Sequence, residues 1–236
     1  MPKQLLFNTP SIGSWITLGH PAIAEIMAEA GFDWLTVDLE HSTITIREAE
    51  DLIRIIELKG VIPLVRLTSN SSEQIKRVMD AGAHGVVVPM VCSGDDARAA
   101  VAAVRYPPVG NRGVGLARAQ GYGSSFETYK SWQESEATVV VQVEHIEAVN
   151  NLEEILTTDG VDAYIVGPYD LSGSMGIPGE FEDPKFVEAM NRIRAIAEQL
   201  KVPGGVHLIE PNPAELLRLV EQGNEFIAYS LDIRMI

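Results

Sequence analysis

The sequence predicts a single (β/α)₈ barrel, and three observations lead to this prediction. The chain has 236 residues, which suits one such barrel and is long for a sandwich. Short apolar runs rich in β-branched residues alternate with longer amphipathic stretches about eight times along the chain. The first run is followed by Thr17-Leu18-Gly19-His20-Pro21, whereas an open doubly wound sheet would normally carry a glycine-rich phosphate loop there. The closed barrel is therefore favoured over the open sheet.

The expected strands are the apolar runs, each short and nearly continuous, as in strands buried on both faces. Amphipathic helices are expected between them. In Ile46–Lys59 the apolar residues fall on one face, and Gly60 stands where a C-cap would be. Ser71 and Gln74 form a capping-box pattern ahead of the next helix. The strands are Ile12–Leu18, Trp34–Asp38, Ile62–Leu67, Gly85–Pro89, Thr138–Glu144, Ala163–Gly167, Gly204–Leu208 and Phe226–Ser230.

Two segments depart from the regular alternation. Tyr106–Ser125, rich in proline and glycine at its start, is expected to be a long loop between the fourth and fifth units, and such loops often carry function. After the eighth strand the sequence reaches Ile236 without room for a full helix, so the usual last helix is expected either to be absent or to lie in a tail beyond the given sequence. No linker or shift in composition divides residues 1–236, which are predicted to form one domain.

The composition limits the classes of function. Hydrophobic residues make up 46% and charged residues 22% of the chain, as in globular domains with a sizeable core. A net charge of −15 argues against binding to nucleic acid or to an anionic membrane surface. Cys92 is the only cysteine, so no disulfide forms within the chain, and neither a signal peptide nor a membrane span is evident. A cytoplasmic protein is predicted.

In such barrels the active site lies at the carboxyl ends of the strands, and polar residues gather there in this sequence. Glu144 and Asp170 follow neighbouring strands, and two carboxylates with room for water suit a hard divalent cation such as Mg²⁺ or Mn²⁺. Such a cation would chelate a 2-oxo acid and stabilise the enolate formed when its C3–C4 bond breaks. The residues expected at this rim are Trp15, Asp38, Glu40, His41, Arg66, Gln142, Glu144, Tyr169, Asp170 and His207.

Other side chains at the rim suggest acid–base and electrostatic roles. Arg66 is suited to hold the developing oxyanion through charge-assisted hydrogen bonds. His41 is the natural proton shuttle, because histidine changes charge near neutral pH. No histidine pair has the spacing of a zinc hydrolase. No lysine lies inside or at the carboxyl end of a predicted strand, so Schiff-base catalysis is disfavoured.

Each of these residues also has a structural interpretation. Asp38 and Glu40 are equally suited to cap the following helix, Glu144 to form an ion pair with Arg66, and Asp170 to act as an N-cap. The convergence of several weak signals on one rim favours the functional interpretation. The residues whose simplest interpretation is structural or solvated are Asp80, His84, Arg112 and His145.

The order of motifs along the chain gives a resemblance to a known family. The motifs are Ile12–Trp15, Ala30–Trp34, Asp38–His41, Pro63–Arg66, Met79–Gly82, Val88–Val91, Arg105–Pro108, Arg112–Gly115, Gln142–Glu144, Gly167–Ser172 and Met175-Gly176. In this order they make the chain similar to the HpcH/HpaI family of class II pyruvate aldolases, which includes 4-hydroxy-2-oxoheptanedioate and 2-keto-3-deoxy-sugar-acid aldolases. The resemblance covers most of the sequence, and although each motif alone is weak, the series is specific.

The resemblance implies a barrel of the phosphoenolpyruvate/pyruvate type, a divalent cation (Mg²⁺, Mn²⁺ or Co²⁺) and no organic cofactor. It implies cleavage of a 4-hydroxy-2-oxo acid to pyruvate and an aldehyde through a metal-bound enolate. It also implies a homo-oligomer, a hexamer built as a trimer of dimers. The implied roles are metal binding by Glu144 and Asp170, catalysis by His41, Arg66 and Asp80, with Asp80 raising the basicity of His41, and substrate binding by Gln142, Tyr169 and Trp15. Arg112 and His207 are further candidates for substrate binding.

Two positions depart from the family pattern. Relatives often have a small residue at position 169, where this chain has Tyr169, and an aliphatic residue at position 207, where it has His207. These changes suggest a different acceptor aldehyde. The alternatives are an acyl-CoA lyase, disfavoured because no basic patch is evident for the CoA phosphates, an oxaloacetate decarboxylase, and a non-catalytic barrel that senses a 2-oxo acid.

Overall fold

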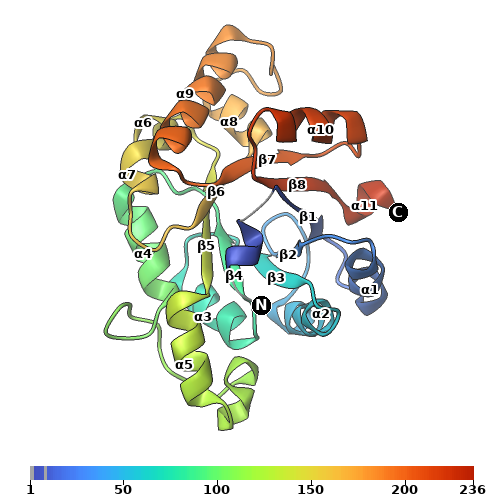
Figure 1. Ribbon diagram of the computed structural model, residues 1–236, viewed down its shortest axis with the longest axis vertical. Helices are drawn as coiled ribbons and strands as arrows, with labels where there is room; N and C mark the ends of the chain where they lie inside the picture. The colour runs from blue at the N-terminus through green and yellow to red at the C-terminus, as the bar shows by residue number, and fades with distance from the viewer. Residues whose placement is uncertain (1–2, 8–9) are drawn as a thin grey trace.

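The eight strands of the protein close into a barrel in chain order, each parallel to its neighbours (Figure 1). The structure is a computed structural model that describes residues 3–7 and 10–236. It confirms the predicted fold class, and the predicted strand boundaries agree to within two residues. The strands are β1 (Ser11–Ile16), β2 (Trp34–Asp38), β3 (Ile62–Arg66), β4 (Gly85–Val88), β5 (Thr138–Val143), β6 (Ala163–Val166), β7 (Gly204–Leu208) and β8 (Phe226–Leu231).

The continuous apolar runs arise because the strands are buried on both faces. Every residue of β2, β3 and β5 is buried. One set of side chains fills the barrel interior, where Trp34 stacks on Phe226 with ring centroids 4.3 Å apart. Gly13 is required beside this stack, because a Cβ atom there would lie 1.9 Å from the Trp34 ring. The other set packs outward against the surrounding helices.

Helices surround the barrel and return the chain to the amino ends of the strands (Figure 1). The helix predicted after Thr45 forms, with a complete capping box between Thr45 and Glu48. The box predicted at Ser71 forms only in half, because the Gln74 side chain accepts from Thr68 instead. The helices are α1 (Pro21–Glu29), α2 (Ile46–Leu58), α3 (Ser72–Asp80), α4 (Gly94–Val104), α5 (Phe126–Ser135), α6 (Ile146–Asn150), α7 (Leu152–Leu156), α8 (Pro168–Ser174), α9 (Pro184–Leu200) and α10 (Pro213–Glu221).

The two irregular segments have more structure than the sequence predicts. After β8 the chain forms α11 (Asp232–Met235), a four-residue helix where none was expected. It is held because the buried Asp232 carboxylate accepts hydrogen bonds from the Thr17 backbone and hydroxyl and from the Leu18 backbone. The expected long loop contains a 3₁₀ segment, η2 (Arg118–Gly123). Among the described residues, no helix has the length and apolarity that crossing a membrane requires.

Candidate active site

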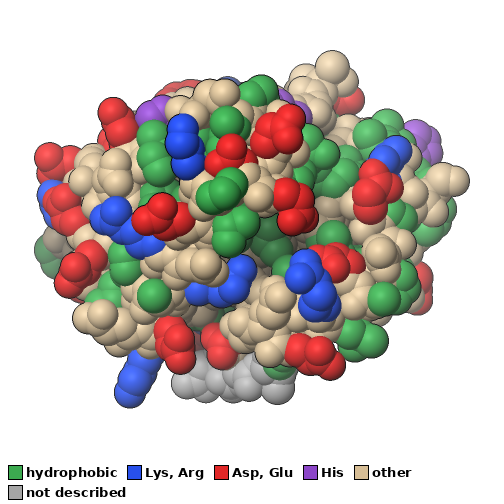
Figure 2. Space-filling view, turned by 90° about the horizontal axis from the view of Figure 1, so that it is seen from above, with side chains coloured by type: hydrophobic (Ala, Val, Ile, Leu, Met, Phe, Trp, Pro, Cys, Tyr) green, Lys and Arg blue, Asp and Glu red, His purple; other side chains and the backbone are tan. Residues whose placement is uncertain are grey.

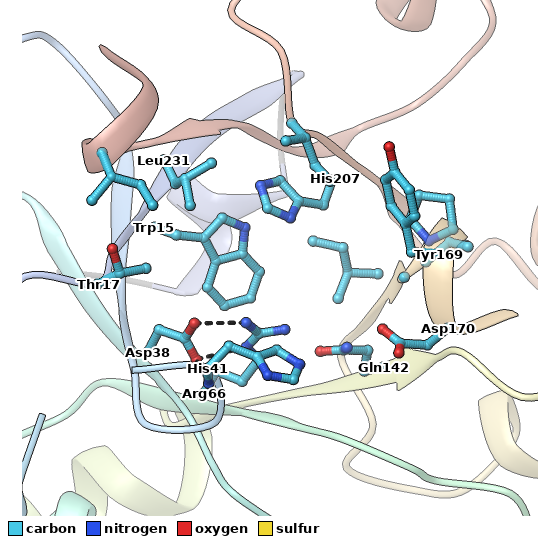
Figure 3. A pocket seen from close by; sticks show the side chains of 16 residues that line it. Trp15, Thr17, Asp38, His41, Arg66, Gln142, Tyr169, Asp170, His207 and Leu231 are labelled. Atoms are coloured by element: carbon cyan, nitrogen blue, oxygen red, sulfur yellow. Dashed lines mark hydrogen bonds and ion pairs between the residues drawn. The ribbon is translucent and has the colours of Figure 1, made fainter. Parts of the chain in front are cut away.

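A cavity of about 390 Å³ opens at the carboxyl ends of the strands (Figure 3). Most of the residues predicted for the site line it. The remaining lining residues are chiefly apolar and include Ile165, Ile209, Leu231 and Ile233. The predicted residues in the lining are Trp15, Asp38, His41, Arg66, Gln142, Tyr169, Asp170 and His207; the predicted Glu40 and Glu144 are not among the lining residues.

Arg66 is held rigidly at the floor of this cavity. It ends β3 beside Asp38, the last residue of β2, in direct register. Its Nε and Nη2 atoms donate to the two carboxylate oxygens of Asp38 at 2.9 and 2.6 Å, the bidentate geometry that fixes a guanidinium plane. Its third nitrogen lies 3.2 Å from Glu40 Oε2, and the group stacks 4.4 Å from the Trp15 ring centroid. The arginine is therefore oriented before any ligand arrives.

The three carboxylates of Glu40, Glu144 and Asp170 lie close enough to repel one another near this arginine, and Asp170 lines the cavity. Burial raises the pKa of Glu144 to about 7; the Met90 N–H bond opposes the rise, and Glu40 and Asp170 add to it. Burial likewise raises the pKa of Glu40 to about 7; Arg66 opposes this, and the Asp38 and Asp170 carboxylates add to it. Such mutual repulsion between carboxylates is relieved by a bound cation.

The donor set fits a hard divalent cation. Glu144 Oε1 accepts from the Met90 backbone N–H at 2.7 Å, and Oε2 accepts from the Gln142 amide, so the carboxylate is fixed while each oxygen keeps a free lone pair. Gln142 Oε1 is buried without a hydrogen-bond partner. Oxygen ligands of this kind suit Mg²⁺, Mn²⁺ or Co²⁺.

The two histidines of the pocket have different environments. His41 is exposed at the rim, and its backbone N–H donates to Asp38 Oδ1 at 3.3 Å. His207 lies deeper, 3.1 Å from the Ser230 carbonyl through Nε2 and 5.4 Å from the Trp15 ring. Burial lowers the pKa of His207 to about 4, so its ring is neutral at physiological pH, with Nε2–H donating to the carbonyl and Nδ1 left as an acceptor.

Two residues beside the pocket adopt backbone angles that non-glycine residues seldom use. Met90 has φ +52°, and its N–H binds Glu144. Ser230 has φ +56°, and its carbonyl oxygen receives His207 Nε2. Strained backbone of this kind persists where surrounding contacts determine it and tends to cluster at functional sites. Here the strain aims two backbone groups at pocket side chains.

The structure does not place Asp80 and Arg112 in the pocket of their own chain. Asp80 ends α3 and therefore lies at the amino end of the barrel, because α3 runs antiparallel to the strands. There it accepts from Arg112 Nη2 at 2.7 Å. Arg112 is buried between the rings of Tyr106 and Tyr129. The prediction that Arg112 binds substrate is corrected within one chain, because its buried guanidinium donates to Asp80, Tyr129 and the Val104 carbonyl and does not line the pocket.

The structure does not support the structural interpretations of Asp38, Glu40, Glu144 and Asp170. Asp38 and Glu40 do not cap a helix, since Thr45 caps α2 and both carboxylates face Arg66. Glu144 makes no ion pair with Arg66, and Asp170 lies inside the first turn of α8, whose N-cap is Gly167. Sequence reasoning placed Asp38 and Glu40 at the rim but missed that both carboxylates hold Arg66. The Asp-x-Glu pattern at a strand end was the available signal.

Tyr169 stands at the edge of the pocket, on the side of Gln142 and Asp170 and opposite Thr17 and Asp38 (Figure 3). Its side chain does not close the cavity. Its ring packs edge-on against Phe181, with centroids 5.0 Å apart, and the residue is 55% exposed. The tyrosine at this position therefore lies at the edge of the pocket and leaves the interior of the cavity open.

Comparison with known proteins decides the family. A family model described as HpcH/HpaI aldolase/citrate lyase matches residues 11–235. The chain belongs to this family. A hydroxypyruvate/pyruvate aldolase of Sagittula stellata is 40% identical over 226 residues, which cover 95% of this chain and 88% of the relative. A 4-hydroxy-2-oxo-heptane-1,7-dioate aldolase of Salmonella heidelberg is 39% identical over 230 residues, covering 96% and 86%.

Solved structures agree with this assignment. The crystal structure of an HpcH/HpaI aldolase/citrate lyase family protein from Burkholderia cenocepacia superposes with a TM-score of 0.92 at 34% identity, covering 99% of this chain and 93% of the other. An HpcH/HpaI aldolase from Desulfitobacterium hafniense gives a TM-score of 0.88 at 33% identity, with coverage of 98% and 90%. The resemblance predicted from the motifs is confirmed, and the chain is a carbon–carbon lyase of the HpcH/HpaI family.

Proposed function

We propose that this protein is a class II aldolase that reversibly cleaves a 4-hydroxy-2-oxo acid to pyruvate and an aldehyde, with a divalent cation at Glu144 and Asp170. The observation that carries the proposal is the pocket itself. An arginine fixed by Asp38, an exposed histidine and Asp170 line one cavity, and two further carboxylates with raised pKa values, Glu40 and Glu144, lie near them. When bound, the cation supplies Lewis-acid stabilisation of the enolate oxygen.

The side chains of this chain account for the remaining chemistry. His41 removes the proton of the C4 hydroxyl as the C3–C4 bond breaks, directly or through one water. The electron pair of that bond becomes the C2–C3 double bond of the enolate, which is then protonated at C3 to give pyruvate. Arg66, held by Asp38 and Glu40, presents its charge to the oxygens that become negative, without reorganising during the reaction.

His207 and Trp15 supply polar contacts at the far side of the pocket. The neutral His207 ring offers Nδ1 as an acceptor, and the buried Trp15 indole N–H has no partner. A hydroxyl group on the aldehyde portion satisfies both, as acceptor to the indole and donor to the imidazole. We therefore propose that the acceptor is a small hydroxylated aldehyde, with Tyr169 and Gln142 completing substrate binding.

Assembly and location complete the proposal. We propose a homo-oligomer, built as a trimer of dimers, in the cytoplasm. The segment that carries Arg112 exposes Val109, Val114, Leu116 and Tyr122, each at least 58% exposed, and apolar side chains of this kind favour contact with another copy. A role for Asp80 at His41 requires that a second copy supplies it, since one chain holds the two at opposite ends of the barrel.

The proposal is tested by pyruvate release from a panel of 4-hydroxy-2-oxo acids, first with EDTA and then with added Mg²⁺, Mn²⁺ or Co²⁺. We expect release to stop with EDTA and to return with metal. Metal-dependent binding of pyruvate or oxalate without cleavage of any panel member would favour the sensor, and release from oxaloacetate alone would favour the decarboxylase. The face shown in Figure 2 carries its basic side chains dispersed among acidic ones, which does not favour an acyl-CoA lyase.

A further inference from the structure

Outside the pocket, three potential metal ligands meet at the carboxyl end of the barrel. Cys92 lies in the loop after β4, His145 directly follows Glu144, and Glu147 lies in the first turn of α6. One ligand atom from each residue lies within 4.8 Å of the other two. His145 Nδ1 is 3.9 Å from the nearer Glu147 oxygen. Sequence reasoning treated His145 as structural for lack of polar neighbours; its ring caps α6, as a structural role requires, but it does have polar neighbours.

The chemistry of this cluster differs from that of the aldolase pocket. A thiol, an imidazole and a carboxylate are the ligand types that Zn²⁺ and related transition metals use, whereas Glu144 and Asp170 offer oxygen alone. Bond lengths of about 2.0–2.3 Å place tetrahedral ligands roughly 3.3–3.8 Å apart. The three ligand atoms, which lie within 4.8 Å of one another, would therefore move closer by at most about 1.5 Å. Three protein ligands would leave one position for water.

The surrounding structure holds the cluster in place. The Cys92 backbone N–H donates to Asp96 Oδ2 at 3.1 Å, and its carbonyl oxygen accepts from Asn151 Nδ2 at 2.8 Å. The His145 ring caps α6 by accepting from the Glu147 backbone N–H through Nδ1 at 3.2 Å, and a metal bound at either ring nitrogen would replace this hydrogen bond. Cys92 and His145 are both partly buried. The backbone of Cys92 is thus fixed by contacts that need no metal.

We propose that Cys92, His145 and Glu147 form a second cation site, selective for Zn²⁺ or another thiophilic divalent metal. The site joins the loop that carries Met90 to the residue that follows Glu144. Because the Met90 N–H binds Glu144 Oε1 at 2.7 Å, an ion in the second site restrains both partners of that bond. The site stands independently of the aldolase reaction, and its test needs no substrate.

The experiment is a Co²⁺ titration of the full chain followed by near-ultraviolet absorption, where a thiolate ligand gives a charge-transfer band. Because the sequence contains one cysteine, any such band reports Cys92. With the pocket first saturated with Mg²⁺, we expect the band to saturate at one Co²⁺ per chain and to be displaced by Zn²⁺. It should be absent in Cys92→Ser. In His145→Ser, which keeps an N-cap acceptor, and in Glu147→Gln, binding should weaken about tenfold or more, the scale at which even outer-shell partners matter.

Glu144→Gln is the matched control for the pocket, and it should retain the band with unchanged affinity. Circular dichroism establishes that each variant is folded. Three results would overturn the proposal. The first is the absence of a band at saturating Co²⁺. The second is a Co²⁺ affinity in His145→Ser and Glu147→Gln equal to that of the wild type, because the thiol would then bind the ion alone. The third is one Co²⁺ per two chains together with dimerisation in sedimentation.

Discussion

The clamp between Asp38 and Arg66 gives the sharpest prediction, tested by Asp38→Asn. Asp38 accepts two bonds from Arg66 and one each from the Glu40 and His41 backbone N–H groups. Asparagine keeps one oxygen, which can still receive the backbone donors. Its amide nitrogen, however, then faces Arg66 Nη2, donor against donor. The substitution therefore breaks the ion pair without opening a cavity.

The magnitude follows from burial. The side chains of Asp38 and Arg66 are 2% and 10% exposed, and removal of one partner of a buried pair costs about 3–5 kcal/mol. Glu40 Oε2 remains 3.2 Å from Arg66 and offsets part of this. We expect a loss of about 2–3 kcal/mol in the free energy of unfolding. Because Arg66 loses its orientation, kcat should fall about 10²-fold, as when one oxyanion donor is removed.

Urea denaturation in EDTA measures the stability, and coupled detection of pyruvate measures the rate. Asp95→Asn is the matched control, because Asp95 lies 2.6 Å from Arg98 in a pair whose side chains are 90% and 54% exposed. It makes the same change in charge and should cost under about 0.5 kcal/mol. If Asp38→Asn unfolds at the midpoint of this control and turns over within twofold of wild type, the clamp has no role in positioning Arg66.

Three further predictions concern other groups of the site. Glu144→Ala should abolish metal-dependent pyruvate release while circular dichroism stays native, and unchanged turnover at saturating Mn²⁺ would remove Glu144 from the cation site. Because burial lowers the pKa of His207 to about 4, the folded protein should lose stability as pH falls from about 6.5 toward 4. His207→Gln should lessen the loss between pH 7 and pH 5 by about 1–2 kcal/mol in urea titrations, and equal losses in both proteins would contradict this. His41→Ala and Asp80→Asn should each slow cleavage by about 10²-fold. If a second copy supplies Asp80, oligomers reassembled from a mixture of the two dissociated variants should regain activity. No recovery in these mixed oligomers would confine Asp80 to its contact with Arg112.

The sequence alone was sufficient for the barrel and for the end of it that holds the site. The period of burial along each strand and helix is local, so Trp34–Asp38 and Ile46–Leu58 could be recognised from their own residues. In a parallel barrel all strands end on one side, so strand-end residues such as Arg66 and Asp170 had to share a rim. The family motifs then assigned roles that periodicity could not.

Other features depend on register and on the paths of loops, which neighbours in sequence do not encode. The clamp requires that Asp38 lies opposite Arg66 across two strands. Asp80 lies far from His41 because α3 carries it to the other end of the barrel. Cys92 meets His145 and Glu147 only because β4 and β5 are neighbours whose following loops turn the same way. Local sequence thus determined which elements form and which end is polar. Only the tertiary structure decided which polar groups touch, because contacts between residues far apart in the chain depend on the packing of all the elements between them.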